Sequence, residues 1–236
     1  MTSIHWENLD VLLGRGVRID PDSIYDKLVV ARRGGYCYEQ STLLSAALSH
    51  IGFTPVAHAA RVVYARPRVE AARTHMFLTV TVNATTYVLD PGYGGYGPLV
   101  PMPLAADAVF RDGRDAYRFL RDGREWTLEA EIDGEWKALW ISTLEPEPPI
   151  DFVMANHYTS THPQSRFATM LLMRALTPDG RRVTVANRDV TIARDGVSEK
   201  SQLADRAALR KLLADHFGFD LPEAETLKVP AIPEWD

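Results

Sequence analysis

Cysteine is nearly absent from the sequence: Cys37 is the single one among 236 residues. One thiol cannot form an internal disulfide, and it cannot build a zinc site from clustered cysteines. Long apolar runs are also missing, since no stretch approaches the about 18 uninterrupted apolar residues of a membrane-spanning helix. The first residues show no basic and apolar stretches of a secretory signal. We therefore expect a cytoplasmic protein with a free thiol and no membrane partner.

An excess of positive charge is absent as well. The 26 lysines and arginines are outnumbered by 31 aspartates and glutamates, which gives a formal net charge of −5. This balance gives no reason to expect a nucleic-acid partner. The hydrophobic fraction of 46% and the charged fraction of 24% are ordinary for a globular protein. The length predicts two or three subdomains that share one envelope.

The residue patterns change from helical to extended along the chain. Apolar residues recur at helical spacing from 20 to 30 and again from Cys37 to Gly52, with Arg33-Gly34-Gly35 as the break. Segments between 56 and 140 are short and rich in β-branched and aromatic residues, with Asp-Gly turns at 122–123 and 133–134 that are typical of hairpins. More strands follow, and 201–217 predicts an amphipathic helix. This order predicts an α+β protein in three parts, with a β-barrel or strongly curved sheet over about 55–145.

Cys37 stands where a loop is predicted to become a helix. A thiol at a helix N-terminus meets unpaired N–H groups and the positive end of the helix dipole, which favour the nucleophilic thiolate. The alternative is that Cys37 is a small buried apolar residue, as many free cysteines are. Position alone leaves both roles open.

Among the seven histidines, His75 has a distinctive setting. It lies near the start of the predicted strand THMFLTVTV, and the following strand, TTYVLDPG, ends near Asp90. A hairpin turn centred between residues 82 and 83 places His75 directly opposite Asp90. Opposed Cβ atoms lie about 4.5–5.5 Å apart, near enough for a hydrogen bond between carboxylate and imidazole. The alternative is an ion pair at a strand end without a catalytic role.

Three motifs, RRGGYCYE, THMFLTV and LDPGYGG, follow one another with 38 residues from Cys37 to His75 and 15 from His75 to Asp90. In this order and spacing they resemble the arylamine N-acetyltransferase family. The segments HWENLD (5–10) and NHYTSTHPQSRF (156–167) agree with that resemblance. The resemblance implies a cysteine-protease-like core with a catalytic triad of Cys37, His75 and Asp90. It also implies a helical subdomain over 1–52, a β-barrel subdomain over 53–160 and an α/β lid over 161–236.

The chemistry that this resemblance implies is ping-pong acyl transfer. Cys37 takes the acetyl group from acetyl-CoA as a thioester, and the nitrogen of an arylamine or hydrazine then removes it. His75 pairs with the thiolate and manages the proton of the amine, while Asp90 fixes the tautomer and stabilises the imidazolium. Acetyl-CoA is a co-substrate, and we expect no bound cofactor and no metal.

Four further residues are implied as substrate-binding. Trp6 occupies the position where the family usually has Phe beside the thiol, and Val63 the position of a pocket wall. Thr74 precedes the histidine and could contact the pantetheine, and Gly94 belongs to a loop near the acyl donor. Ordinary packing or turn geometry is the alternative for each of the four.

The sequence also departs from the family pattern. Gln40 stands where the family signature usually has Asn, and Arg33 and Glu39 are expected to form a structural ion pair. The family normally has a further helical stretch before HWENLD, and here five residues precede Trp6. We therefore expect a shortened first subdomain.

Three rival functions remain open from the sequence. A member of the same family can act as an amide synthase that releases a polyketide chain from its thioester. A Cys-His-Asp triad also serves transglutaminase-like cysteine proteases, although the RGG motif and the length argue against this reading. The third rival is a non-enzymatic relic with a truncated N-terminus.

Overall fold

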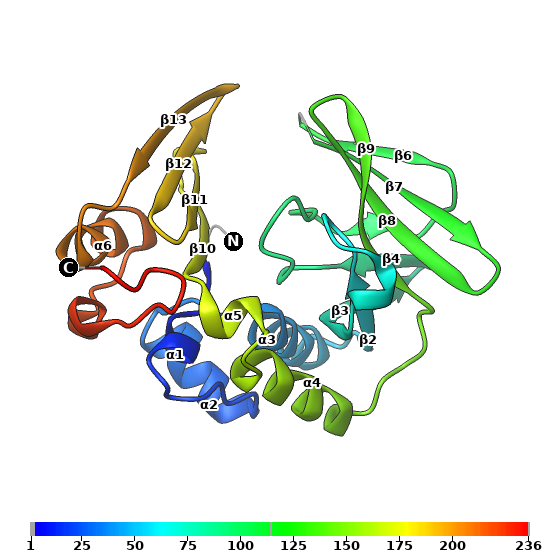
Figure 1. Cartoon of the computed structure of the whole chain (residues 1–236). Helices are drawn as coiled ribbons and strands as arrows, with labels where there is room; N and C mark the ends of the chain where they lie inside the picture. The colour runs from blue at the N-terminus through cyan, green and yellow to red at the C-terminus, as the bar shows by residue number, and fades with distance from the viewer. Residues whose placement is uncertain (1–2, 114, 236) are drawn as a thin grey trace. The chain divides into compact units, whose positions relative to one another are not determined.

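The structure is a computed structural model that describes residues 3–113 and 115–235. The chain forms two compact units. The first unit contains the residues up to Tyr36 and those from His157 onward, and the second contains Cys37 to Asn156. The dark blue beginning and the orange to red end of the chain in Figure 1 therefore belong to one unit. The division into 1–52, 53–160 and 161–236 stays a prediction, because these units group residues by contact and not by chain order.

The second unit is built on an eight-stranded antiparallel sheet in the order β5-β4-β3-β2-β9-β8-β7-β6. The sheet curves strongly and comes near to closing on itself, which confirms the predicted barrel (Figure 1). Its strands are β2 (Val56–Val62), β3 (Arg73–Val82), β4 (Thr85–Leu89), β5 (Met102–Pro103), β6 (Val109–Asp112), β7 (Asp115–Asp122), β8 (Glu125–Ile132) and β9 (Glu135–Ser142).

Two hairpin turns in this sheet explain its connections. Asp133 and Gly134 link β8 to β9 with φ of +53° and +78°, and Asn83 and Ala84 link β3 to β4 with φ of +48° and +64°. Positive φ at both central residues is the type I′ geometry, which matches the right-handed twist of paired strands. The Asp-Gly turn at 133–134 is therefore where the sequence predicted it.

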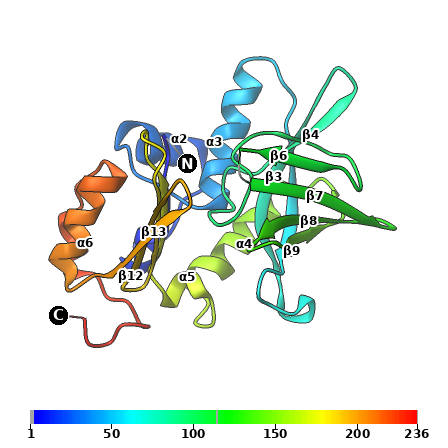
Figure 2. The same cartoon turned by 90° about the horizontal axis from the view of Figure 1, so that it is seen from above.

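The helix α3 (Cys37–His50) begins at the predicted residue and packs against β3. Its first five residues, Cys37 to Ser41, are all buried, although three of them are polar. Figure 2 shows α3 beside the part of the sheet that contains β3 and β4. A second long helix, α4 (Pro149–Thr161), leads out of this unit, and the short 3-10 helix η2 (Arg68–Glu70) lies between β2 and β3.

The first unit contains a five-stranded antiparallel sheet in the order β1-β10-β11-β12-β13. The pairing of β1 with β10 joins the beginning of the chain to a strand in its last third, with Trp6 opposite Arg174 and Glu7 opposite Met173. The strands are β1 (Trp6–Glu7), β10 (Leu172–Leu176), β11 (Arg182–Ala186), β12 (Asp189–Arg194) and β13 (Val197–Gln202). The helices are α1 (Leu9–Leu12), α2 (Pro21–Tyr25), η1 (Asp26–Val30), α5 (Arg166–Thr169), α6 (Arg206–Leu212), η3 (Leu213–Phe217) and η4 (Pro222–Thr226).

The predicted helix over 201–217 is wrong at its start. Residues 201 and 202 end the exposed edge strand β13, and the helix begins at Arg206. Asp205 caps it, since its side chain accepts a hydrogen bond from the Ala208 N–H at 2.7 Å. The π-helical turn η3 continues α6 and ends at Gly218 with φ of +73°, a left-handed conformation that favours glycine.

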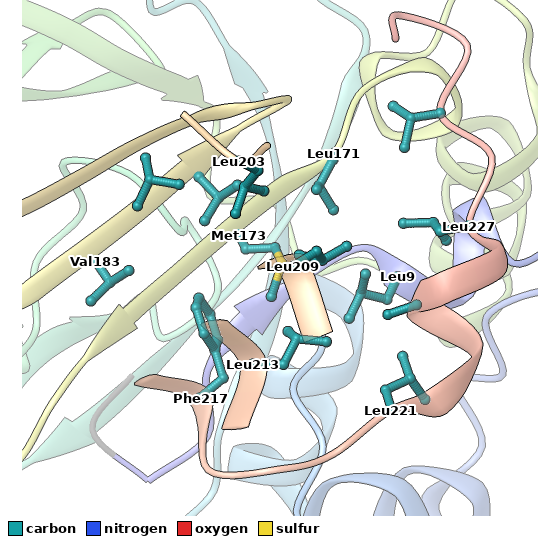
Figure 3. Close-up of a cluster of buried hydrophobic side chains, with 14 of the residues drawn as sticks. Leu9, Leu171, Met173, Val183, Leu203, Leu209, Leu213, Phe217, Leu221 and Leu227 are labelled. Atoms are coloured by element: carbon teal, nitrogen blue, oxygen red, sulfur yellow. The ribbon is translucent and has the colours of Figure 1, made fainter. Parts of the chain in front are cut away.

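A hydrophobic core fills the first unit between this sheet and its helices. Leu9 from α1 meets Met173 from β10 and Leu209 from α6, and all three are fully buried (Figure 3). Among the residues that the structure describes, no helix is long and apolar enough to cross a membrane.

Candidate active site

Cys37 opens helix α3 and is 5% exposed. Its Sγ lies 3.9 Å from the carbonyl oxygen of Thr74, to which the thiol can donate. The loop after β4 packs directly on it, because a Cβ added to Gly92 would overlap the Cα of Cys37 and come within 2.9 Å of its Cβ. Position 92 thus accepts only glycine without displacement, since side-chain atoms do not come that close.

His75 and Asp90 form a buried hydrogen-bonded pair. The Nε2 atom of His75 lies 2.9 Å from Oδ2 and 3.0 Å from Oδ1 of Asp90, and each residue is 4% exposed. The same imidazole interacts with the side chain of Cys37. Because Nε2 is taken by the carboxylate, Nδ1 is the ring nitrogen left for the sulfur. The structure thus brings together the three residues of the predicted triad, all within the second unit.

The predicted strand register is nevertheless wrong, because the centre of the hairpin turn lies one residue later than predicted. Strand β3 pairs with β4 from Leu78↔Leu89 to Val82↔Thr85, so the turn is centred between residues 83 and 84. Continued along the strands, this register puts Asp90 opposite Phe77 and diagonal to His75. The error shifts the pairing by two residues, and such a shift leaves every side chain on its predicted face. The predicted contact is therefore present although the predicted opposition is not.

The surroundings of His75 favour its charged form. Burial alone would lower the pKa of His75, but the charge of Asp90 and its hydrogen bond outweigh burial, and the Cys37 side chain adds to them. Together they raise the pKa of His75 to about 10. At neutral pH the arrangement therefore stabilises an imidazolium beside the sulfur of Cys37.

Trp140 is a member of this cluster that the sequence did not indicate. Its Nε1–H donates to Asp90 Oδ2 at 3.0 Å, and the side chain is fully buried. Its ring stacks on Phe77 at a centroid distance of 4.5 Å. In the segment WKALWIS the residue looks like an ordinary strand core position, so no local signal could have identified it.

Tyr93 packs against the ring of His75. Its ring meets the His75 ring edge-on at 5.4 Å, and its hydroxyl donates to the Leu139 carbonyl at 3.3 Å. The backbone N–H of Val63 also donates to that carbonyl, at 2.9 Å. Val63, which was predicted to line the pocket, and the loop that carries Gly94 are thus both hydrogen-bonded to the same carbonyl of β9. Gly94 itself is buried with φ of +73°.

The remaining two predicted binding residues have different settings. The carbonyl of Thr74 points to the site, since it accepts hydrogen bonds from Tyr38 Oη at 2.7 Å and from Cys37 Sγ. Trp6 lies in the first unit, where it bridges to Gly35 and its ring packs on Phe167 at 5.6 Å. The binding roles of Trp6, Val63, Thr74 and Gly94 stay predictions.

Buried ion pairs in the first unit anchor the segment before the nucleophile. The Arg33 guanidinium donates to Glu7 Oε1 at 2.7 Å and to Asp10 Oδ1 at 3.2 Å. A Cβ at Gly34 would lie 2.5 Å from the carbonyl oxygen of His5, so this glycine is required by packing against the chain start. The expected pair of Arg33 with Glu39 stays a prediction. No group of three or more potential metal ligands gathers among residues 3–113 and 115–235.

Comparisons with known proteins show what this chain is similar to. A family model described as N-acetyltransferase matches residues 1–226. The chain is 34% identical over 224 residues to an arylamine N-acetyltransferase of Escherichia coli K12, covering 94% of this chain and 80% of that relative. It is 37% identical over 224 residues to an arylamine N-acetyltransferase of Mycolicibacterium smegmatis, covering 93% and 81%.

A solved structure is similarly close. The arylamine N-acetyltransferase of Mycobacterium marinum in complex with CoA superposes with a TM-score of 0.88 at 34% identity, over 94% of this chain and 84% of that one. The range that the family model matches, residues 1–226, includes the segments that carry Cys37, His75 and Asp90.

Proposed function

The chain belongs to the arylamine N-acetyltransferase family, and from this premise we propose that it works through a thioester on Cys37. It is an acyltransferase that moves the acetyl group of acetyl-CoA to an arylamine, and we propose hydrazines as further acceptors. The observation that carries the proposal is the buried imidazole of His75, which bonds to Asp90 and interacts with Cys37. The CoA complex of the Mycobacterium marinum relative supports acetyl-CoA as co-substrate.

In the first half-reaction the Cys37 thiolate attacks the thioester carbon of acetyl-CoA. The carbonyl oxygen becomes an oxyanion, which the backbone N–H groups at the start of α3 would stabilise. When the oxyanion collapses, the bond to the CoA sulfur breaks and the acetyl group stays on Cys37. The His75 imidazolium protonates the departing CoA sulfur and becomes neutral.

In the second half-reaction the acceptor nitrogen attacks the acetyl carbon on Cys37. Neutral His75 accepts the proton that the nitrogen loses, and the bond to the Cys37 sulfur breaks. This restores the thiolate and the imidazolium. Asp90 holds Nε2 throughout, so Nδ1 is always presented to the reacting atoms, and its charge stabilises the imidazolium.

The binding groups are proposed with this mechanism. Trp6 would supply an aromatic wall for a planar amine, and Val63 an apolar one. Thr74 would contact the pantetheine, and Gly94 would leave room for the acyl donor. A nucleophilic thiol needs a reducing compartment, which supports a cytoplasmic location. The amide synthase alternative is not favoured, because relatives at 34% and 37% identity are named arylamine N-acetyltransferases.

A single assay tests the proposed function. Purified protein is mixed with acetyl-CoA and either an aniline or a hydrazine, and the release of free CoA thiol is followed. We expect release that depends on the acceptor, and we expect Cys37→Ala to abolish it while the circular dichroism spectrum is retained. If folded wild-type protein releases no CoA with either acceptor, the acetyltransferase function is wrong. If Cys37→Ala retains substantial turnover, Cys37 is not the nucleophile.

A further inference from the structure

Two hydroxyl groups of helix α3 hold the strand that carries His75. Tyr38 Oη donates to the carbonyl of Thr74 at 2.7 Å, and Ser41 Oγ donates to the carbonyl of Met76 at 3.0 Å. Thr74 and Met76 are the residues directly before and after His75. Tyr38 and Ser41 lie three positions apart, so they project from the same face of the helix. Both side chains are fully buried, at 0% exposure.

The topology explains why these two carbonyls take hydroxyl partners. Strand β4 pairs with β3 from Leu78 to Val82, while β2 pairs with β3 along the part that includes His75. In the described structure, the first half of β3 is therefore paired with strand β2 on one side, and is not paired on the side where β4 pairs further along. Backbone carbonyls that are shielded from water need donors. The two hydroxyls of α3 supply them where β4 has ended, in a part-buried bond to Thr74 and a buried bond to Met76.

The same helix begins with Cys37. Tyr38, next to Cys37, and Ser41, about one helical turn further, therefore form hydrogen bonds to the backbone on both sides of His75. Cys37 and His75 come from elements 38 residues apart in the chain, and no covalent constraint fixes their separation. A proton-transferring pair loses much of its efficiency when it is displaced by about 1 Å.

We propose that Tyr38 and Ser41 are positioning residues, whose hydroxyls hold His75 within hydrogen-bonding reach of the Cys37 sulfur. Their role rests on the proposed function, because it assumes that the sulfur reacts as a thiolate paired with His75. They act through the β3 backbone, and their loss weakens the ion pair without removing either member.

The test measures the thiol itself. The rate of Cys37 alkylation by iodoacetamide is recorded against pH for wild type, Tyr38→Phe, Ser41→Ala and the double variant. Cys37 is the single thiol of the chain, so the signal has one source. We expect the midpoint of the alkylation profile to move to higher pH in each variant, and both the rate at pH 7 and kcat/KM for acetyl transfer to fall about tenfold in the double variant. Ser41→Thr, which keeps a hydroxyl, should restore much of the wild-type profile.

Ser142→Ala is the matched control. Ser142 is buried in β9, donates to the Ala59 carbonyl of β2 at 2.8 Å and accepts from the Leu144 N–H at 3.1 Å. Its loss therefore removes buried hydroxyl bonds, and neither of them involves β3. The control should lower the melting temperature as the test variants do, with an unmoved alkylation midpoint. If the test variants also leave the midpoint unmoved, the two hydroxyls are structural only and the proposal is wrong. If Tyr38→Phe fails to fold, Ser41→Ala and its threonine rescue decide the question alone.

The two proposals fail in different ways. If wild-type protein does not acetylate amines but the variants shift the alkylation profile, the proposed acetyl transfer is wrong. The positioning role then stands, because the part of the proposed function that it assumes is the pairing of Cys37 with His75. If acetyl transfer is normal in wild type and the profile does not respond to the variants, the positioning role is wrong and the function stands.

Discussion

Trp140 donates its indole N–H to the same Asp90 oxygen, Oδ2, that lies 2.9 Å from His75 Nε2. A buried carboxylate can rotate about its bond to Cβ, and two donors that converge on one oxygen fix that rotation. Stacking on Phe77 fixes the indole in turn. The series of interacting side chains Cys37, His75 and Asp90 therefore continues to a fourth one, Trp140 on β9.

Replacing this donor should slow the chemical step. Trp140→Phe keeps an aromatic ring for the stack on Phe77 but leaves Asp90 with one fewer donor. We expect kcat to fall about tenfold with KM for acetyl-CoA nearly unchanged, as measured by steady-state kinetics. The control is Trp126→Phe, because Trp126 packs on Phe119 and is outside this series. An equal fall in both variants would assign the effect to general loss of packing.

Removing the charge of Asp90 should cost far more. Asp90→Asn keeps the shape of the side chain, but an amide cannot stabilise an imidazolium and its NH₂ group competes as a donor. We expect kcat/KM to fall by about 10³-fold or more, by analogy with the same change in other triads. Activity near the wild-type level would reduce Asp90 to a structural partner of His75.

The close approach of Gly92 to the nucleophile gives a steric prediction. Gly92→Ala places a methyl group against Cys37, so the loop or the start of α3 must shift. We expect a loss of about 100-fold in kcat/KM, because displacements near 1 Å have effects of this size.

Gly134→Ala is its control. Gly134 lies in the exposed β8–β9 turn at φ of +78°, where an added Cβ meets nothing within 4 Å. This change should lower the free energy of unfolding by about 1 kcal/mol and leave kcat/KM unchanged. Equal activity of the two variants would contradict the steric argument.

The pKa of His75 predicts how stability depends on pH. It is raised from 6.5 to about 10 in the folded protein, so the folded state binds the proton more tightly than the unfolded chain. The resulting stabilisation is complete below pH 6.5 and is lost as the pH rises toward 10. Urea unfolding across this range should show a steeper loss of stability in wild type than in His75→Gln. Parallel curves for the two proteins would show that His75 is not held as an imidazolium.

The buried ion pair of Glu7 with Arg33 should matter for stability more than for chemistry. The side chain of Glu7 is fully buried, and Glu7→Gln leaves the guanidinium without its closest charge partner. We expect the free energy of unfolding to fall by about 3 kcal/mol in urea titrations. The exposed pair of Arg15 with Glu223 is the control, and Glu223→Gln should lower the free energy of unfolding far less, because water screens an exposed pair.

Short-range patterns account for the elements that were predicted correctly. The type I′ turn at 133–134 follows from Asp-Gly, and the start of α3 follows from the glycines before Cys37 and the apolar spacing after it. Strand β13 was misread because all six of its residues are exposed, so it carries no alternation of apolar and polar side chains. Strand β1 was missed because its two residues pair with β10, whose sequence begins more than 160 residues later.

The sequence by itself determined that a thiol opens a helix, that a histidine and a carboxylate lie on one face of neighbouring strands, and which family these motifs belong to. Each of these depends on a few adjacent residues, whose backbone preferences and side-chain period act locally. Only the tertiary structure decided that Asp90 lies diagonal to His75 and that Trp140, 50 residues away in the chain, donates to Asp90. It also decided that Tyr38 and Ser41 form hydrogen bonds to the strand on both sides of His75. Those contacts depend on the curvature of the sheet and the exact length of one turn, because distant segments have no local code for their meeting point.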